Sequence, residues 1–432
     1  MRLSEGWGAA RGTDPNGQTP LSLAPETAHA AQRLAQGWPG PASRLRIAQV
    51  APLYESVPPQ LYGGTERIVS YLTEELVRQG YDVTLFASGD SVTSGRLVPA
   101  CQRSLRLDTR CVDRMAHHVR MLEQVFQHVK DFDVIHFHVD YLHFPLSRRQ
   151  PLAHVTTLHG RLDIPDLVPL FQEFRDMPVV SISAAQREPL PWANWQATVH
   201  HGLPEELYRF RTEPGRYLAF LGRVSPEKGA DRAIEIAKRV ELPLKIAAKI
   251  DPVDREYFEA VVKPLLRDPL VEFVGEIDDM EKDEFLGNAY ALLFPVAWPE
   301  PFGLVMIEAM ACGTPVIAYQ KGSVPEVMEE GRTGFIVRGL EDAAAAVRRV
   351  PELSRTRCRA VFEERFTVAR MARDYLRVYE RLIAEHARVN GTAAFSHAKS
   401  RPAGSLRPSS GNRRCHMSRT RGRPTSSEAE TP

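Results

Sequence analysis

The sequence predicts an α/β protein made of two doubly wound domains, each with a parallel sheet covered by helices on both faces. Three observations carry this prediction. Short apolar strands alternate with amphipathic helices from Arg46 to His200, the alternation stops in a stretch with prolines and glycines at residues 201–215, and it restarts at Tyr217. Such alternation implies parallel strands joined by crossover helices. We therefore expect two sheets that face a central cleft, where ligands bind beyond the carboxyl ends of the strands.

Hydrophobic periodicity places the individual elements. In the first half, a helix is expected at residues 65–79. Strands are expected there at residues 46–50, 82–86, 134–137, 154–157, 179–182 and 197–200. In the second half, strands are expected at residues 217–221, 244–248, 271–274, 291–294 and 315–318. Helices are expected at residues 230–240, 254–266, 281–288, 304–312, 341–349 and 367–385.

The same pattern predicts the domain organisation. A Rossmann-like N-terminal domain is expected at residues 44–205 and a Rossmann-like C-terminal domain at 206–370, followed by a helix at 371–387 that crosses back to the first domain. Residues 1–43 are rich in Gly, Pro, Ala, Ser and Thr, so we expect a disordered leader or an upstream start-site extension. Residues 388–432 are expected to be a disordered basic tail. Contact of that tail with nucleic acid or an anionic membrane is the less favoured alternative, because no aromatic residue lies among its charges.

Composition excludes several classes of protein. The formal net charge is +1, which argues against a nucleic-acid binder that relies on overall charge. The five cysteines form no C-x-x-C pair, and their odd number argues against a disulfide framework. No apolar run approaches the ~20 residues of a membrane helix, and no signal-like apolar segment follows Met1. We therefore expect a cytoplasmic protein with reduced thiols and no transmembrane segment.

The strongest chemical signal is the segment from Trp298 to Glu308. Prolines on both sides of Glu300 keep that residue in a loop, and a helix begins at Gly303–Leu304. The first N–H groups of a helix have no intrahelical partner and carry the positive end of its dipole, so they form an anion site. Glu308 is then suited to a ribose diol and Glu300 to sugar hydroxyls. The alternative without a function is that Glu300 and Glu308 are surface glutamates beside an ordinary helix start.

A second segment, residues 220–229, carries two cations, Arg223 and Lys228. When a glycosidic bond to phosphate breaks, the leaving diphosphate gains negative charge. Fixed cations at that place bind the transition state more tightly than the ground state. Arginine offers a planar fork for phosphate, and lysine offers a point charge. Taken alone, two solvent-facing basic residues in a loop would explain the pattern equally well.

Together these segments resemble the family-four retaining glycosyltransferases of the GT-B fold. EPFGLVMIE at residues 300–308, continued by AMACGTPVIA, is the most specific match. Other matching segments lie at residues 62–66, 220–229, 322–326 and 331–334, and the resemblance covers about residues 46–382. It implies retaining, metal-independent transfer of a hexose from a nucleotide diphosphosugar. Among donors, the resemblance favours UDP-glucose. The acceptor stays unnamed.

The resemblance also implies site residues. The expected catalytic residues are His159, Arg223, Lys228 and Glu300. The expected donor-binding residues are Gly63, Gly64, Glu276, Ile277, Phe302, Gly303, Leu304, Val305 and Glu308. His159 ends a strand-like run and precedes a glycine, so its side chain is expected to face the cleft. The alternative is that His159 has only a packing or capping role. Residues 246–250 lack the glycine pair common in the family, which leaves the nucleotide base open.

No metal or other cofactor is expected. His136 and His138 lie two apart on one strand, but no third ligand stands at suitable spacing. Asp131 and Asp133 form a D-x-D pattern at the start of a parallel strand, which is the wrong end for a site.

Rival functions remain at this stage. The first is a nucleotide-sugar epimerase or a glycoside phosphorylase on the same fold, and the second is a non-catalytic nucleotide-sugar-binding protein. An NAD dehydrogenase is more distant, because the G-x-G-x-x-G fingerprint is missing. The expected partners are the nucleotide-sugar donor and a small-molecule, lipid or glycan acceptor, without nucleic acid. Peripheral membrane contact and the oligomeric state stay open.

Overall fold

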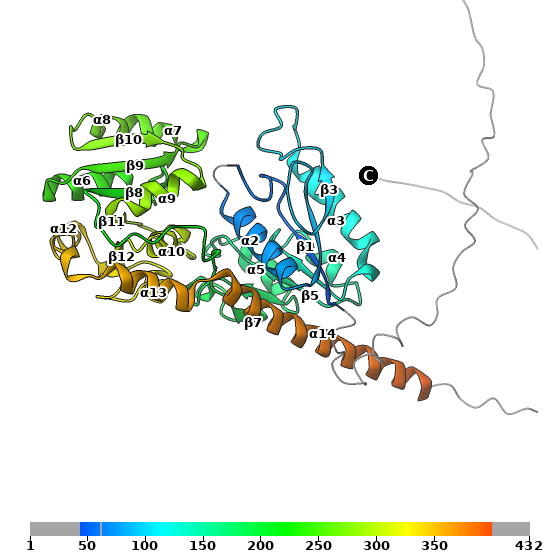
Figure 1. Ribbon diagram of the computed structural model, residues 1–432. Helices are drawn as coiled ribbons and strands as arrows, with labels where there is room; N and C mark the ends of the chain where they lie inside the picture. Colours follow the sequence, from blue (N-terminus) through cyan, green and yellow to red (C-terminus); the bar gives the residue numbers. More distant parts are fainter. Residues whose placement is uncertain (1–43, 61–62, 400–432) are drawn as a thin grey trace, which may run out of the picture. The chain divides into compact units, whose positions relative to one another are not determined.

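A computed structural model describes residues 44–60 and 63–399 of the chain (Figure 1). The leader expected at residues 1–43 lies outside the described residues, as does the part of the expected basic tail from residue 400 to residue 432. The two parallel sheets that the periodicity predicted are both present.

The N-terminal domain contains a seven-stranded parallel sheet with the order β3-β2-β1-β4-β5-β6-β7. Its strands are β1 (Arg46–Val50), β2 (Asp82–Ser88), β3 (Arg96–Cys101), β4 (Val134–Phe137), β5 (His154–Thr157), β6 (Val179–Ser181) and β7 (Trp195–Thr198). Its helices are α2 (Gly64–Arg78), α3 (Arg114–Gln127), α4 (Phe144–Ser147) and α5 (Leu167–Glu173), with short 3-10 turns η1 (Val129–Asp131) and η2 (Ala185–Arg187). The strand order reverses at β1, so the connections that leave the carboxyl ends of β1 and β4 run to opposite faces of the sheet and leave a crevice between them.

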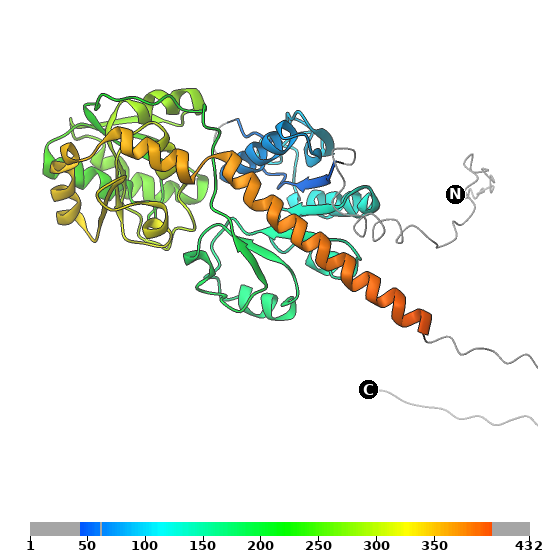
Figure 2. The same ribbon diagram turned by 60° about the horizontal axis from the view of Figure 1, so that its bottom comes forward.

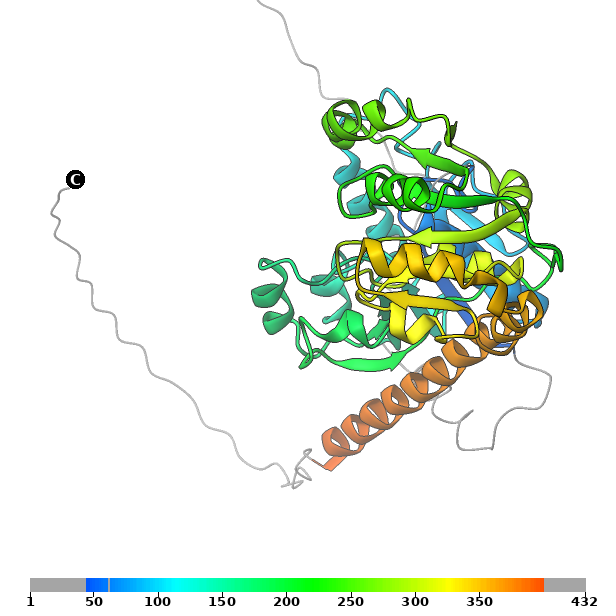
Figure 3. The ribbon, with the colours of Figure 1, turned by 90° about the vertical axis from the view of Figure 1, so that its left-hand side faces the viewer.

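The C-terminal domain contains a six-stranded parallel sheet with the order β10-β9-β8-β11-β12-β13, and it faces the viewer in Figure 3, coloured green to yellow. Its strands are β8 (Tyr217–Arg223), β9 (Leu244–Lys249), β10 (Val271–Gly275), β11 (Ala289–Phe294), β12 (Val316–Tyr319) and β13 (Gly334–Val337). Its main helices are α6 (Ala230–Val240), α9 (Asp279–Gly287), α10 (Leu304–Ala311), α11 (Val324–Val327), α12 (Leu340–Arg348) and α13 (Arg355–Arg365), with a 3-10 turn η5 (Val350–Glu352). This strand order reverses between β8 and β11.

The helix expected at residues 254–266 is not continuous. The chain forms a 3-10 turn η3 (Pro252–Asp254), a turn of helix α7 (Arg255–Tyr257), a π-helical segment η4 (Phe258–Val262) and a turn of helix α8 (Lys263–Leu265). Pro264 lacks an N–H, and its ring would clash with the carbonyl four residues earlier, inside η4. The wider π-helical turn therefore accommodates a proline that an α-helix would not.

The last helix, α14, runs from Val368 to Lys399, past residue 387 where the sequence predicted that it would end. Ala384, Ala387 and Arg388 are strong helix formers, which explains the continuation into the first part of the expected tail. The expected disordered tail is therefore wrong for residues 388–399. Within the described part of the chain, no helix combines the length and the hydropathy that a bilayer crossing requires.

The apolar face of α14 covers the N-terminal sheet, although the helix follows the C-terminal domain in the sequence (Figure 2). Met371, Tyr375 and Tyr379 pack in one core cluster with Ile47 of β1 and Val155 of β5. At the crossing between the domains, the N–H of Leu203 donates to the carbonyl of Phe366, at 2.9 Å, and the N–H of Val368 donates back to the carbonyl of Leu203, at 2.7 Å. The two connections between the domains therefore run side by side.

Candidate active site

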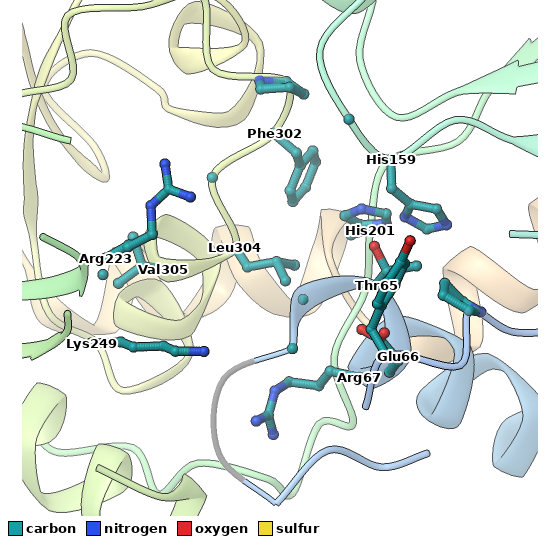
Figure 4. A pocket seen from close by; sticks show the side chains of 18 of the residues that line it. Thr65, Glu66, Arg67, His159, His201, Arg223, Lys249, Phe302, Leu304 and Val305 are labelled. Carbon is teal, nitrogen blue, oxygen red and sulfur yellow. The ribbon is translucent and has the colours of Figure 1, made fainter. Parts of the chain in front are cut away.

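A cavity of about 630 Å³ lies between the two domains, at the carboxyl ends of their strands. It is lined by every site residue that the sequence predicted. These are His159, Arg223, Lys228, Glu300, Gly63, Gly64, Glu276, Ile277, Phe302, Gly303, Leu304, Val305 and Glu308. The cavity therefore brings together residues from both halves of the chain (Figure 4).

Two helix amino ends face each other across this cavity. Gly303 precedes α10 in a left-handed conformation with φ of 78°, and no side chain in the described part of the chain caps the helix. Gly64 begins α2, and a Cβ placed on it would lie 3.7 Å from the Cδ1 of Leu304, the first residue of α10. Both helices direct uncapped N–H groups and the positive ends of their dipoles toward the same space. The cavity is thus built to attract an anion.

Glu300 is almost fully buried and holds two hydrogen-bond donors. Its Oε2 accepts from the Nζ of Lys228 at 2.5 Å and from the Nε1 of Trp298 at 2.9 Å. The Nζ of Lys228 also lies 5.1 Å from the centre of the Trp298 ring, a cation–π distance. The cation and the carboxylate that are expected to serve a diphosphosugar therefore pair with each other.

Arg223, at the end of β8, is surrounded by carboxylates of its own domain. Its guanidinium nitrogens lie 2.6 Å from Glu227, 3.1 Å from Asp254 and 3.8 Å from Asp251. Lys249, at the end of β9, also pairs with Asp251, at 3.2 Å. Figure 4 shows Arg223 and Lys249 on the same side of the cavity as Val305. An arriving diphosphate would have to compete with these carboxylates for Arg223.

Glu308 is buried one turn inside α10 and joins a network that crosses the cleft. Its Oε1 accepts from the Nζ of Lys282 at 3.1 Å and lies 3.4 Å from the hydroxyl of Tyr208. Lys282 lies 3.5 Å from Asp279, which also pairs with Arg67 of α2 in the other domain. These contacts link the amino ends of α2 and α9 with Glu308. Sequence reasoning missed Arg67 and Lys282.

His159 follows β5 and faces the cavity from the N-terminal domain. Its Nε2 lies 2.9 Å from the Nδ1 of His138, and its ring stacks on that of His201 with centroids 5.3 Å apart. Phe302 of the opposite domain contacts the ring of His201 edge-on, at 4.8 Å. Burial lowers the pKa of His159 to about 3, so its imidazole is neutral at physiological pH.

Family models match both halves of the chain. Residues 62–197 match the model described as Glycosyltransferase Family 4, and residues 209–365 match the model described as Glycosyl transferases group 1. The chain belongs to the family-four glycosyltransferases. The two matches together span most of the described residues, and residues 198–208 lie between them.

Curated relatives of this family-four glycosyltransferase match it over part of their length. The D-inositol 3-phosphate glycosyltransferase of Streptomyces scabiei is 32% identical over 176 residues, which is 35% of this chain and 39% of the relative. The alpha-maltose-1-phosphate synthase of Mycolicibacterium smegmatis is 36% identical over 126 residues, which is 28% of this chain and 32% of the relative. The chain thus spans less than half the length of these relatives.

Solved structures share the fold of this family-four glycosyltransferase. AviGT4, a glycosyltransferase involved in Avilamycin A biosynthesis, has a TM-score of 0.63 at 23% identity, over 79% of this chain and 98% of the other. Sucrose-phosphate synthase from Thermosynechococcus elongatus has a TM-score of 0.66 at 20% identity, over 79% of this chain and 100% of the other. Both likenesses support the GT-B fold that the sequence predicted.

Asp140 is a cavity residue of this glycosyltransferase that sequence reasoning missed. It follows β4 and adopts a left-handed conformation with φ of 49°, which is uncommon for a residue with a side chain. The Asp140 side chain is exposed to the cavity, and the protein atoms around the cavity partly desolvate its carboxyl, which raises the pKa of that carboxyl. The rule that found His159, a polar residue just beyond the carboxyl end of a strand, would also have found Asp140.

The histidines that raised the question of a metal have other partners. His136 contacts the Tyr379 hydroxyl through Nδ1 and the Thr157 hydroxyl through Nε2, each at 2.7 Å. His138 lies 2.8 Å from the Oε1 of Gln49. Among the residues that the structure describes, no group of three or more His, Cys, Asp or Glu side chains is arranged to hold a metal ion.

Gly322 supports the loop that carries Glu300, and we expect Gly322→Ala to displace that loop. Gly322 has φ of 50°, and a Cβ there would lie 2.4 Å from the carbonyl oxygen of Glu300 and 2.5 Å from its nitrogen. These backbone atoms cannot move away from the added Cβ as the end of a flexible side chain could. We expect about tenfold slower sugar transfer and about 1–2 kcal/mol lower stability. Initial rates and urea unfolding measure the two effects.

Gly331→Ala is the matched control. Gly331 is also left-handed, with φ of 70°, but a Cβ there would meet no atom of the described residues within 4 Å. This variant keeps the backbone strain and lacks the contact with Glu300. An equal loss of activity in both variants would show that strain, and not the position of Glu300, explains the effect.

Proposed function

We propose that this family-four glycosyltransferase moves a hexose from a nucleotide diphosphosugar to an acceptor hydroxyl, with retention of configuration and without a metal ion. UDP-glucose is the first donor to test. One observation carries the proposal. Lys228, Arg223 and the amino ends of α2 and α10 line one cavity, and that cavity also holds Glu300 and Glu308. Together these groups suit a ligand that combines a diphosphate with hydroxyl groups.

The proposed donor site lies on the C-terminal domain. The diphosphate would rest against the first N–H groups of α10, and Glu308 would accept the hydrogens of the ribose diol. Because Lys228 and Glu300 pair at 2.5 Å, donor binding would exchange this pair for two new ones. Lys228 would then contact the diphosphate, and Glu300 would contact hydroxyls of the transferred sugar.

The chemical step follows from the charges in the cavity. As the bond between the anomeric carbon and the diphosphate breaks, negative charge grows on the leaving oxygen. Lys228, Arg223 and the α10 amino end stabilise that charge more than they stabilise the bound donor. The departing diphosphate then takes the proton of the acceptor hydroxyl, which attacks from the same face. This route retains the anomeric configuration and needs no enzyme nucleophile.

A ligand screen followed by product analysis tests the proposal. UDP, ADP, GDP and their glucose conjugates are compared by thermal shift, because a specific ligand stabilises the fold by RT ln(1 + [L]/Kd). The best donor is then incubated with candidate acceptors, with and without EDTA, and the anomeric proton of the product is read by NMR. We expect an α product at a rate that EDTA leaves unchanged.

The same assay separates the rival activities. A β product from an α donor would contradict retention, and loss of activity in EDTA would contradict the metal-free mechanism. Epimerised donor without transfer, or a requirement for free phosphate, would replace the transferase by an epimerase or a phosphorylase. Binding without turnover of any acceptor would indicate a non-catalytic nucleotide-sugar-binding protein.

A further inference from the structure

A continuous chain of buried polar side chains connects His159 with the C-terminal helix α14. His159 contacts His138 at 2.9 Å, and His138 contacts Gln49 of β1 at 2.8 Å. The Nε2 of Gln49 donates to the hydroxyl of Tyr379, at 3.2 Å, and that hydroxyl contacts the Nδ1 of His136, at 2.7 Å. The chain then continues through the hydroxyls of Thr157 and Tyr375, which lie 2.9 Å apart.

The hydrogen bonds of this chain all run in one direction. The Oε1 of Gln49 is an acceptor only, so the Nε2 of His138 must carry a proton, and the Nδ1 of neutral His138 is then an acceptor. His159 must therefore donate through its own Nε2–H. On the other side of Gln49, the amide N–H donates to the Tyr379 hydroxyl. The amide nitrogen cannot accept in return, so the hydrogen of that hydroxyl is donated to the Nδ1 of His136. Each proton position follows from the orientation of one amide.

The other ring nitrogen of His159, Nδ1, is a hydrogen-bond acceptor in this arrangement. Its Nδ1 is buried and has no hydrogen-bond partner among the described residues, and His159 itself lines the cavity. With the proton on Nε2, Nδ1 carries a lone pair. A hydroxyl group can donate to that lone pair, whereas a deprotonated phosphate oxygen has no hydrogen to offer.

We propose that Gln49, oriented by Tyr379 of α14, acts through His138 to hold His159 as the neutral Nε2–H tautomer, so that its Nδ1 accepts a hydrogen bond from a substrate hydroxyl. Gln49, His138 and Tyr379 are positioning residues, because none of them would touch the reacting atoms. The use of Nδ1 in transfer rests on the proposed function, whereas the tautomer does not.

Burial makes this arrangement durable. Gln49, His136 and Tyr379 are all 0% exposed, so water does not compete for their hydrogen bonds. Burial also holds the pKa of His138 well below its ordinary value, and a neutral histidine has one donor and one acceptor nitrogen. Unpaired buried polar groups destabilise the fold, so the chain is most stable when every member is satisfied.

Nitrogen NMR of protein labelled with ¹⁵N-histidine tests the tautomer directly. The resonances of His159 are assigned as those lost in His159→Gln, at pH 7.5 and without any substrate. We expect one tautomer, with Nε2 protonated. In Gln49→Met, which fills the same space without an acceptor, we expect signals of both tautomers. A protonated Nδ1 in the unmodified protein, or an unchanged pattern in Gln49→Met, would overturn the proposal.

Three further variants separate positioning from general damage. Gln49→Glu with an ionised carboxyl offers only acceptors toward His138, so the Nε2–H tautomer should persist. Tyr379→Phe removes the acceptor that orients the Gln49 amide, so both tautomers should appear. Tyr375→Phe is the matched control on the same helix, because the hydroxyl that it removes contacts Thr157 at the far end of the chain. Phenylalanine keeps the ring contacts of Tyr375 with His136 and Tyr379. A mixed pattern in Tyr375→Phe equal to that in Tyr379→Phe would contradict a specific role for Gln49.

An activity measurement links the tautomer to catalysis. We expect kcat to fall about tenfold in Gln49→Met, because that is the effect of losing one hydrogen bond to the reacting substrate. In Gln49→Glu we expect kcat to recover. Unchanged kcat in a variant with mixed tautomers would remove the catalytic part of the proposal. If the unmodified protein shows the expected tautomer but transfers no sugar, the proposed function fails and the tautomer assignment stands.

Discussion

Replacing Lys228 with alanine is expected to lower kcat for sugar transfer by about 10²–10³-fold while the protein stays folded. The Nζ of Lys228 is held between Glu300 and the Trp298 ring, so the cation is already in place before a donor arrives. One preorganised group that stabilises developing negative charge contributes about 3–4 kcal/mol to lowering the barrier. The measurement is kcat with the best donor from the ligand screen, beside the circular dichroism spectrum of each variant.

Two variants sharpen this prediction. Lys238→Ala is the control, because Lys238 lies on the outside of α6 and pairs with Glu235 at 3.6 Å, away from the cavity. The double variant Lys228→Ala/Glu300→Gln asks whether Lys228 serves mainly to neutralise Glu300. If so, removing both charges would restore activity. We expect no recovery, and wild-type turnover in either variant would refute the role of Lys228 at the leaving group.

Acidification from pH 7.5 to pH 5.5 is expected to lower the free energy of unfolding by several kcal/mol. Burial lowers the pKa of seven histidines. The lowering is large for five of them, which are His136, His138, His143, His159 and His201. In the unfolded chain each has a pKa near 6.5. Below that pH the unfolded state binds more protons than the folded state, so acid favours unfolding. Each histidine contributes up to about 1.4 kcal/mol per pH unit.

Other groups do not reverse this sign. Four carboxyls oppose it, which are those of Asp140, Glu55, Glu66 and Asp254, because a carboxyl whose pKa is raised in the fold takes up a proton there first. They are fewer than the seven histidines. The pKa of Glu326 is lowered, by hydrogen bonds from the His200 side chain and from the backbone of Ala184 and Ala185 that outweigh desolvation, so its contribution is lost only at lower pH. Urea unfolding at pH 7.5, 6.5 and 5.5 measures the effect. A free energy of unfolding that does not change over this range would contradict it.

His143→Gln tests the histidine explanation at one position. His143 lies outside the cavity, and its two ring nitrogens contact the hydroxyls of Ser147 and Thr156, each at 2.6 Å. A glutamine amide can still donate and accept but does not titrate in this range. We expect the slope of stability against pH to fall by about one proton, whatever the change in absolute stability.

Local sequence determined the features that depend on a short stretch of chain. The alternation of apolar runs predicted the central strands, because strand and helix periods differ and each leaves its own pattern. The α10 start was predictable for the same reason: Pro301 and Gly303 end the loop, and the helix that follows supplies its own anion site. The helix predicted at residues 254–266 is present as a helical run whose middle is π-helical, because Pro264 lacks the N–H that an α-helix needs there.

Tertiary structure decided which of these local features meet. The pair of Arg67 and Asp279 joins residues 212 apart in the sequence, and the contact of Gln49 with Tyr379 joins residues 330 apart. The local sequence around these residues does not indicate their partners, because any arginine on a helix or glutamine on a strand has the same local pattern whichever residue it contacts in the fold. The sequence by itself therefore determined two sheets and an anion-binding helix start. Only the folded chain decided that both domains contribute to one cavity and that α14 is connected to His159 through Gln49 and His138. Side-chain contacts act over a few ångströms, so they depend on where distant segments pack.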